Sequence, residues 1–538
     1  MIQIRLSGII SGLSGHPQDT SSLARRAHRV NKAVDPPLGV GYSWGMKKLV
    51  YCSQMEAIDR ETQKTMLPIL LIEQAALRLW TRAREVFPEL DADSKLVFLC
   101  GGGNNGSDAL AAARCAACEG YRDITCIVLP RGNELHQMEQ FFLETYPVKL
   151  VHPEEAVPVV RDADFIFEGL CGTGLKNALG GMAKVLVDEA NENHHARKIA
   201  IDVPAGLADE LPCSDATVFH ADLTVTMGLE KVVFTHPLLR AICGRIDVVN
   251  PCFPLARLEA CDTSFFEADD WDAFPLRALS SDAYKKTRGH LYVFGGSSRF
   301  PGAARLSCRA AFHSRAGLIT WYVDDDCLPI AASESPSVMV RRLSDGFDLA
   351  PADAVLAGPG WGEGRGDLLL QILKAGRPTV LDADGIRAYA AVWKEQAPTQ
   401  GLLVMTPHLG ELAVLSKAVL GLDVSHGSIR EFLEGIQEIA RKTKSVLVVK
   451  GSVVDVATAT DVTVFDGGNP SLGVAGSGDV LSGVIGALLA GGMSVKDAAL
   501  TGTALHQKAG RRASEAEGYY DSEALIALLG QVVREAER

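Results

Sequence analysis

The sequence has no apolar run long enough to span a lipid bilayer. Its longest apolar stretch near a glycine cluster, residues 483–493, is well short of the roughly 20 residues that a membrane helix requires. It also lacks an excess of basic residues: 53 Lys and Arg face 66 Asp and Glu, for a formal net charge of −13. Duplex nucleic acids and anionic membranes bind basic surfaces, so neither is an expected partner.

Closely spaced cysteines are also scarce. The 12 cysteines are scattered, and only Cys115 and Cys118 form a C-x-x-C pair, with no second pair at zinc spacing. We therefore expect small buried core residues rather than a metal or redox site. Free thiols in this number are typical of a reducing compartment, so we expect a cytoplasmic protein.

The first 45 residues lack sustained periodicity, and they lack the long apolar segment and cleavage site of a secretory signal. Met46 then begins an ordered-looking segment. Our hypothesis is that Met46 is the biological start, or that residues 1–45 form a floppy extension.

The remaining chain is too long for one hydrophobic core, so at least two domains are expected. In residues 46–255, apolar β-branched runs alternate with helical patterns, which is typical of a doubly wound parallel sheet. The expected strands are 95–100, 124–129, 163–168, 198–203 and 222–227, and the expected helices include 108–119 and 182–192.

A weakly patterned stretch, residues 256–281, is the expected linker, and alternation resumes in a second α/β domain, residues 282–538. The expected strands there are 290–295, 318–323, 353–358, 378–383, 402–406 and 446–450. The expected helices are 302–315, 365–375, 410–420, 428–443, 479–490, 496–511 and 521–535.

Each half carries a glycine-rich loop of its own design. Residues 101–108 read Gly-Gly-Gly-Asn-Asn-Gly-Ser-Asp after an apolar strand, and residues 473–479 read Gly-Val-Ala-Gly-Ser-Gly-Asp before a helix. Free N–H groups at a helix N-terminus bind anions, and glycine lets a phosphate approach. Two such loops predict two sites for phosphate-bearing ligands.

Two further motifs end strands in the first half, at residues 168–174 and 201–206. With the loop at 101–108, they make this half similar to the epimerase domain of the NAD(P)H-hydrate repair proteins. The resemblance implies a Rossmann-like fold that interconverts the R and S epimers of hydrated NADH or NADPH. The substrate-binding residues it implies are Asn104, Asn105, Gly106, Ser107, Asp108, Gly172, Thr173, Gly174 and Asp202. The implied K⁺ ligands are Asn105, Glu168 and Ala205.

Three positions depart from the family pattern. Ser107 stands where glycine is usual, Glu168 replaces an aspartate, and Ala205 replaces a serine. Glutamate still offers oxygen to a hard cation, whereas alanine offers no side-chain ligand. A structural module without epimerase activity is therefore the alternative for this half.

In the second half, six motifs follow strands or precede helices, in an order that resembles the ribokinase-like superfamily. The run Pro-His-Leu-Gly-Glu at 407–411, Lys-Gly at 450–451 and Gly-Ser-Gly-Asp at 476–479 is most similar to its NAD(P)H-hydrate dehydratase branch. Asp479 is the expected catalytic base, with a helix cap as the alternative. The nucleotide-binding residues are then Lys450, Gly451, Ser452, Val453, Val454, Gly476, Ser477 and Gly478. The hydrate would contact Ala303, Gly360, His408 and Asp479.

The chemistry suits these residue types. N–H groups of residues 476–478 would stabilise a phosphoryl group, and an adjacent carboxylate would accept the proton of the attacking hydroxyl. The resemblance implies a bifunctional repair enzyme that uses ADP as phosphate donor, with Mg²⁺ at the nucleotide and K⁺ at the epimerase site, and we expect a homo-oligomer. Val474 and Ala475 replace a usual Thr-Gly. The alternative is a small-molecule kinase with a non-catalytic N-terminal domain.

Overall fold

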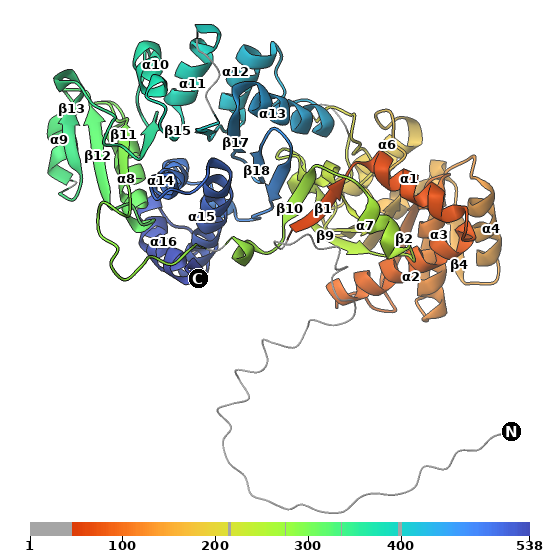
Figure 1. The fold of residues 1–538 in the computed structure, drawn as a ribbon. Helices are drawn as coiled ribbons and strands as arrows, with labels where there is room; N and C mark the ends of the chain where they lie inside the picture. Colours follow the sequence, from red (N-terminus) through yellow and green to blue (C-terminus); the bar gives the residue numbers. More distant parts are fainter. Residues whose placement is uncertain (1–45, 214–216, 275, 335, 396–400) are drawn as a thin grey trace, which may run out of the picture.

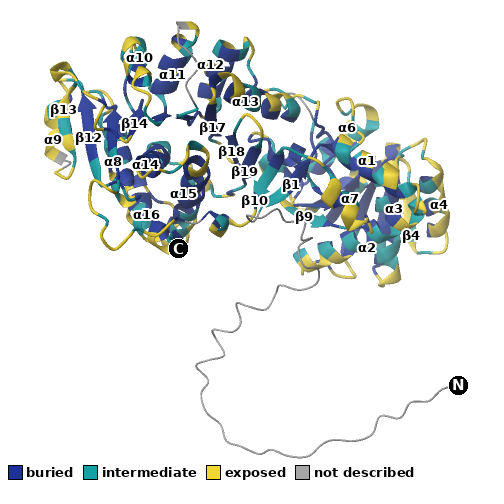
Figure 2. Ribbon diagram, viewed as in Figure 1, coloured by how far each residue is buried: buried dark blue, intermediate teal, exposed yellow. Residues whose placement is uncertain are grey.

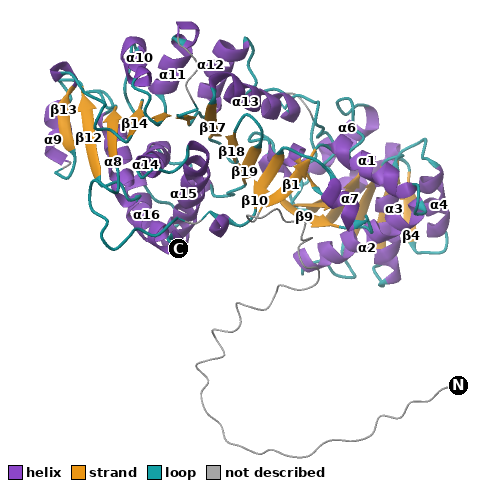
Figure 3. Cartoon of the chain, in the orientation of Figure 1, coloured by secondary structure: helices purple, strands orange, loops and turns teal. Residues whose placement is uncertain are grey.

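The computed structural model describes residues 46–538 except 214–216, 275, 335 and 396–400 (Figure 1). The hypothesis about residues 1–45 concerns a segment outside the described residues. The chain forms two sheets with helices on both faces (Figure 3). The predicted α/β class with two doubly wound units is confirmed.

The first sheet has seven strands, all of which pair in parallel. In spatial order they are β4 (Val148–Val151), β3 (Asp123–Val128), β2 (Lys95–Cys100), β5 (Phe165–Gly169), β6 (Arg197–Ile201), β7 (Leu223–Met227) and β9 (Arg245–Val249). One face is covered by α1 (Cys52–Gln63), α2 (Pro68–Val86), α3 (Asn104–Cys118), α4 (Glu134–Leu143) and α7 (Leu255–Ala260), and the other by α5 (Ala156–Arg161) and α6 (Gly181–Glu192).

The second sheet has twelve strands. Its parallel part runs β13 (Met339–Arg342), β12 (Leu318–Val323), β11 (His290–Phe294), β14 (Ala354–Ala357), β15 (Thr379–Leu381), β16 (Leu403–Met405) and β17 (Ser445–Val449). It continues through β18 (Val454–Ala457), β19 (Val462–Phe465), β10 (Phe265–Ala268), β1 (Met46–Val50) and β8 (Glu230–Lys231).

Helices cover both faces of this parallel part (Figure 1). On one face lie α8 (Pro301–His313), α9 (Leu328–Glu334), α14 (Ser477–Ala490), α15 (Val495–Glu517) and α16 (Ser522–Ala536). On the other lie α10 (Gly366–Lys374), α11 (Asp384–Ala391), α12 (Leu409–Leu420) and α13 (Ile429–Thr443). The central strands are buried throughout (Figure 2), as expected for apolar strands between two helical layers.

The two halves of the chain share the second sheet. Strands β1 and β8 come from the first half, and β10 lies inside the expected linker, where it pairs with both β1 and β19. Apolar residues of both halves also meet in one core, for example Phe234 with Phe432 and Val449. Residues 265–268 of the expected linker are therefore part of the sheet that joins the halves.

Two helices begin more than one residue before the predicted start. Helix α3 begins at Asn104 with Gly103 as its N-cap, so Asp108 lies inside the helix and does not cap it. Helix α14 begins at Ser477, and its N-cap is Gly476 in a left-handed conformation (φ 90°). Asp479 consequently lies in the first turn of α14, and the cap alternative for this residue is wrong.

Candidate active sites

A cavity of about 900 Å³ lies at the carboxyl end of the first sheet. Parallel α/β sheets bind ligands at this end. Seven of the nine epimerase residues predicted from the sequence line the cavity, namely Asn104, Asn105, Asp108, Gly172, Thr173, Gly174 and Asp202. Helix α1 adds Glu56 and Asp59, which the sequence analysis did not identify.

The other two predicted residues, Gly106 and Ser107, do not line the cavity. Ser107 is fully buried, and its hydroxyl donates to the Gly103 carbonyl 3.3 Å away. A side chain at Gly106 would collide with the backbone of Gly101, where a Cβ would lie 1.7 Å from the carbonyl oxygen. Both residues therefore serve the packing of α3, and the family's glycine at position 107 is dispensable here.

The carboxylate of Glu168 is fully buried below this cavity. Its Oε1 accepts from the Leu170 N–H (2.6 Å) and its Oε2 from the Ala205 N–H (2.9 Å). Burial raises the pKa of Glu168 to about 8, against the opposing effect of these backbone N–H groups. The extra methylene of glutamate thus lets the carboxylate tie two strand-end loops together directly.

The predicted K⁺ ligands do not fit a cation in this arrangement. Both Glu168 oxygens face N–H donors, and Ala205 supplies a methyl group and an N–H. The Asn105 amide Nδ2 donates to the carbonyls of Cys171 and Ile201, each at 2.9 Å. A hard cation needs several free oxygens around it, so the expectation of a K⁺ site here is not supported.

Asp202 lies at the end of β6 with a positive φ of 65°, a conformation that non-glycine residues seldom adopt. Its Oδ1 accepts from Lys231 Nζ (2.7 Å), Thr226 Oγ1 (3.1 Å) and the Met227 N–H (3.1 Å). Lys231 is fully buried, so the pair lies in a low-dielectric setting where such contacts are strong. Backbone strain of this kind concentrates at functional sites.

Asp108 and Asp202 both line this cavity. Burial raises the pKa of Asp108 well above its usual range, and the charge of Asp202 raises it further. Two carboxyl groups that face one cavity are candidates for proton transfer to and from a ligand.

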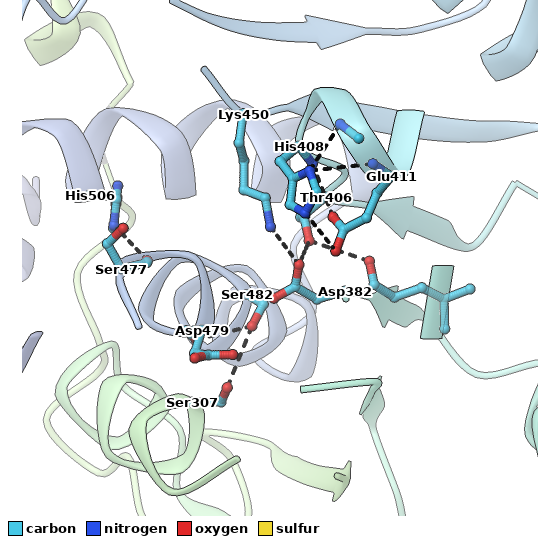
Figure 4. A network of polar contacts seen from close by, with 12 residues as sticks. Ser307, Asp382, Thr406, His408, Glu411, Lys450, Ser477, Asp479, Ser482 and His506 are labelled. Atoms are coloured by element: carbon cyan, nitrogen blue, oxygen red, sulfur yellow. Dashed lines mark hydrogen bonds and ion pairs between the residues drawn. The ribbon is translucent and has the colours of Figure 1, made fainter. Parts of the chain in front are cut away.

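The second site lies at the carboxyl ends of β15, β16 and β17 (Figure 4). Lys450 Nζ lies 2.6 Å from Asp382 Oδ1, and Thr406 Oγ1 donates to the same oxygen at 2.8 Å. Although burial lowers it, the pKa of Lys450 is raised overall by Asp382 and Glu411. Lys450 is therefore a paired cation, with 20% of its side chain exposed beside a buried carboxylate.

Asp479 lies beside this pair in the first turn of α14. Burial raises its pKa to about 7, Asp382 adds to the shift, and Lys450 opposes it. A carboxylate with this pKa changes its protonation near neutral pH, as a general base must. Ser482, one turn later, donates to the Asp479 backbone carbonyl at 3.0 Å.

The glycine loop before α14 brings its backbone next to Lys450. A Cβ at Gly478 would lie 3.2 Å from Lys450 Nζ, and one at Gly476 would collide with Leu306. The Ser477 N–H donates to the Val474 carbonyl at 3.2 Å. Of the three N–H groups expected to bind an anion, that of Ser477 is thus already engaged.

The buried ring of His506 lies behind the same loop. Its Nε2 lies 3.0 Å from the Ser477 carbonyl. Burial lowers the pKa of His506 to about 4, so the ring is neutral and donates this hydrogen bond. His506 therefore holds the first residue of α14 in place.

His408 has a structural task that its motif did not reveal. It is the N-cap of α12, where its Nδ1 accepts from the N–H groups of Gly410 (3.0 Å) and Glu411 (3.3 Å). Glu411 completes a capping box by accepting from the His408 N–H at 3.0 Å. The ring is about half exposed (54%), and its Nε2 lies 3.3 Å from Glu411 Oε1, so both ring nitrogens face groups of the α12 N-terminus.

The remaining predicted residues divide into two groups. Ala303 and Gly360 are neighbours, since a Cβ at Gly360 would lie 3.1 Å from Ala303 Cβ. Val453 and Val454, in contrast, place their side chains in the two cores. Only their backbone can contribute to a nucleotide site.

Sequence reasoning missed Asp382, Glu411 and Lys231 as site residues. Asp382 follows a buried strand and precedes Ala383, which has a positive φ of 49°. An acidic residue at a strand end was a usable signal. The sequence held no such signal for Lys231, because its contact with Asp202 at the end of β6 depends on the turn between β7 and β8.

Across the part of the chain that the structure describes, no group of three or more His, Cys, Asp or Glu side chains could hold a metal ion. Among the same residues, no helix is both long and apolar enough to cross a membrane.

Comparison with known proteins finds matches over both halves of the chain. Residues 291–530 match the family model of NAD(P)H-hydrate dehydratase, and residues 69–233 match that of the YjeF-related protein N-terminus. A bifunctional NAD(P)H-hydrate repair enzyme of Coxiella burnetii is 30% identical over 83% of this chain and 89% of its own length. This chain belongs to the bifunctional NAD(P)H-hydrate repair enzyme family.

Other relatives have the same name. The Escherichia coli enzyme is 31% identical over 79% of this chain and 81% of its own, and the Salinibacter ruber enzyme is 30% identical over 90% and 95%. Among solved structures, the ADP/ATP-dependent NAD(P)H-hydrate dehydratase from Bacillus subtilis is 24% identical, with a TM-score of 0.44, over 50% of this chain and 98% of its own.

Proposed function

We propose that this chain repairs hydrated NADH and NADPH at two active sites. The N-terminal site would interconvert the R and S epimers of the hydrates. The C-terminal site would dehydrate the S epimer to NAD(P)H with ADP as phosphate donor, and release AMP and phosphate. Membership of the family and the two domain models, in this order along the chain, support the proposal.

The position and pKa of Asp479 carry the proposal for the C-terminal site. Its carboxylate accepts the proton of the hydrate hydroxyl while the hydroxyl oxygen attacks the β-phosphorus of ADP. The bond from this phosphorus to the bridging oxygen breaks, and AMP leaves. The phosphate then leaves the ring carbon with the bonding electron pair, a ring proton is lost, and the double bond is restored.

The residues around Asp479 suit the charge that develops in this step. Lys450 presents a cation beside Gly478 at the N-terminus of α14, and this end of a helix favours anions. Mg²⁺ would enter with the nucleotide, since it is usually held by phosphate oxygens and few protein ligands. It would neutralise phosphate charge there.

For the N-terminal site, we propose that Asp202 binds the hydrated ring and that residues 172–178 receive its phosphates. Lys231 holds Asp202 in position. The Glu168 carboxylate links the loops at Leu170 and Ala205 through their N–H groups. K⁺ bound by Asn105, Glu168 and Ala205 is therefore not part of this proposal.

The test uses the recovery of reduced-nicotinamide absorbance. Pure S-hydrate of NADH is given to the protein with Mg²⁺ and either ADP, ATP or no nucleotide. We expect recovery with ADP, and with R-hydrate a slower recovery that depends on the N-terminal site. If S-hydrate recovers but R-hydrate does not recover beyond its spontaneous rate, the N-terminal half is a non-catalytic module. No recovery in any mixture refutes the proposal.

We further propose a cytoplasmic homo-oligomer. All 12 cysteines are free, which suits a reducing compartment. Large apolar side chains are exposed on the N-terminal half, including Leu67 (67%) and Phe141 (66%), and exposed apolar surface is often used for contacts between subunits when it is contiguous. Light scattering after size-exclusion chromatography measures the oligomeric state, and a monomer would contradict this part.

A further inference from the structure

The loop that carries Lys450 rests on the N-terminal half of the chain. Ser452 Oγ donates to the Pro237 carbonyl at 2.6 Å. A Cβ at Gly451 would lie 3.0 Å from Pro237 Cβ, so the backbone of this loop lies directly against the proline ring. The contact joins residues 215 positions apart.

The loop that leads to α14 is held by the same N-terminal segment. Arg240 Nε lies 2.6 Å from Asp466 Oδ2, and Arg240 Nη1 donates to the Gly244 carbonyl at 2.7 Å. Both members of the ion pair are about four-fifths buried. Asp466 directly follows β19 and begins the stretch that reaches Gly476.

The segment between these contacts is itself immobilised. The short 3-10 helix Val232–Thr235 packs three buried side chains into the core that Val449 and Val453 also form. His236 is fully buried, with its ring 5.1 Å from that of Phe432 in α13. Pro237 and Arg240 are therefore presented from a rigid support.

We infer that residues 236–240 of the N-terminal half brace both nucleotide loops of the C-terminal site, with Pro237 and Arg240 as positioning residues. This inference rests on the proposed function for the assignment of the two loops to the nucleotide. Both loops are attached to the brace, which therefore contributes to the relative position of Lys450 and the α14 N-terminus. Preorganised loops bind a ligand more tightly because less order is lost on binding.

The test uses the full chain with Arg240→Gln and, separately, Asp466→Asn. The matched control is Arg430→Gln. Arg430 pairs with Glu210 across the same two halves and lies 3.7 Å above the Tyr51 ring, and neither partner belongs to the two loops. Hydrogen exchange is measured at residues 450–454 and 466–478, and ADP affinity is measured by calorimetry with Mg²⁺.

We expect faster exchange in the 466–478 loop of both Arg240→Gln and Asp466→Asn. We also expect the dissociation constant for ADP to rise about three- to tenfold. The double variant Arg240→Gln/Asp466→Asn should show the same exchange and ADP affinity as either single variant, because all three lack the same ion pair. Arg430→Gln should change neither exchange in these loops nor ADP affinity.

The brace is refuted if the folded Arg240→Gln and Asp466→Asn proteins exchange like the wild type in these loops. It is also refuted if Arg430→Gln loosens the loops equally, because the effect would then be general instability. A third outcome separates the two proposals. If the variants exchange faster in these loops but the wild type does not bind ADP, the brace is supported and the proposed nucleotide site is refuted.

Discussion

The ammonium group of Lys450 lies 2.6 Å from the Asp382 carboxylate, which is only 2% exposed. Removing one partner of a buried pair leaves the other charge uncompensated, at about 3–5 kcal/mol of stability. Lys450→Met should therefore lower the free energy of unfolding by about this amount in urea titrations, and Lys450→Met/Asp382→Asn should recover part of it.

The exposed pair Lys417–Asp423, at 3.1 Å, provides the control. Lys417→Met should cost less than about 1 kcal/mol, as exposed ion pairs do. Equal losses of unfolding free energy in Lys450→Met and Lys417→Met would contradict the claim that the Lys450–Asp382 pair stabilises the fold more than an exposed pair.

Asp479→Asn should reduce kcat of the dehydratase by about 10²–10⁴, the usual contribution of a general base. In the wild type, kcat/KM should rise with pH and level off above about pH 7, because the base must lose its proton. Asp497→Asn changes the first turn of the next helix, α15, and should leave the rate unchanged. A normal pH profile in Asp479→Asn would exclude Asp479 as the base.

Epimerisation should depend on Asp202 but dehydration should not. Asp202→Asn removes the charge that Lys231 pairs with, so we expect the conversion of R-hydrate to slow by about 10²-fold or more, while pure S-hydrate is dehydrated normally. Asp222→Asn alters another strand-end aspartate of the same sheet, where it accepts from the Lys198 N–H. If both variants slow epimerisation alike, Asp202 has no special role.

The wild type should gain no specific stability from K⁺. Melting temperatures in equal concentrations of KCl and NaCl are expected to agree, because Glu168 already joins the two loops. The double variant Glu168→Asp/Ala205→Ser restores the oxygen ligands usual in the family. Its melting temperature should be higher in KCl than in NaCl. A K⁺-dependent rise in the wild-type melting temperature would show that a cation still binds.

Asp455 is fully buried in β18, and neither carboxylate oxygen has a hydrogen-bond partner among the described residues. Burial raises its pKa to about 8. Because the native state holds the proton more tightly than the unfolded chain, this group destabilises the fold increasingly from about pH 4 to pH 8. Asp455→Val should raise the free energy of unfolding at pH 8 by more than about 1 kcal/mol, with a smaller gain at pH 5. A gain independent of pH, or a loss, would contradict this account.

Buried parallel strands could be predicted because their apolar runs are continuous, as in β2 and β17. Strands β4 and β13 were missed because they lie at sheet edges with exposed positions. Strands β1, β8 and β10 were missed because their partners are distant in the chain. No local pattern reveals that residues 46–50 join the second sheet.

The motifs predicted two candidate sites at the carboxyl ends of the two sheets, but local packing decides which motif residues can face a ligand there. Gly106 and Val453 belong to matching motifs and yet serve packing. His408 matched a substrate contact, while its ring nitrogen caps α12. A sequence motif shows which residue types occur together. It does not show which of them contact a ligand and which only stabilise the loop.

The most direct test of the central claim is to quantify AMP, inorganic phosphate and NADH during turnover of S-hydrate with ADP. The account predicts equal amounts of the three products, with no lasting phosphorylated hydrate. AMP that accumulates with a stable phosphorylated product and without NADH would contradict it and identify a small-molecule kinase.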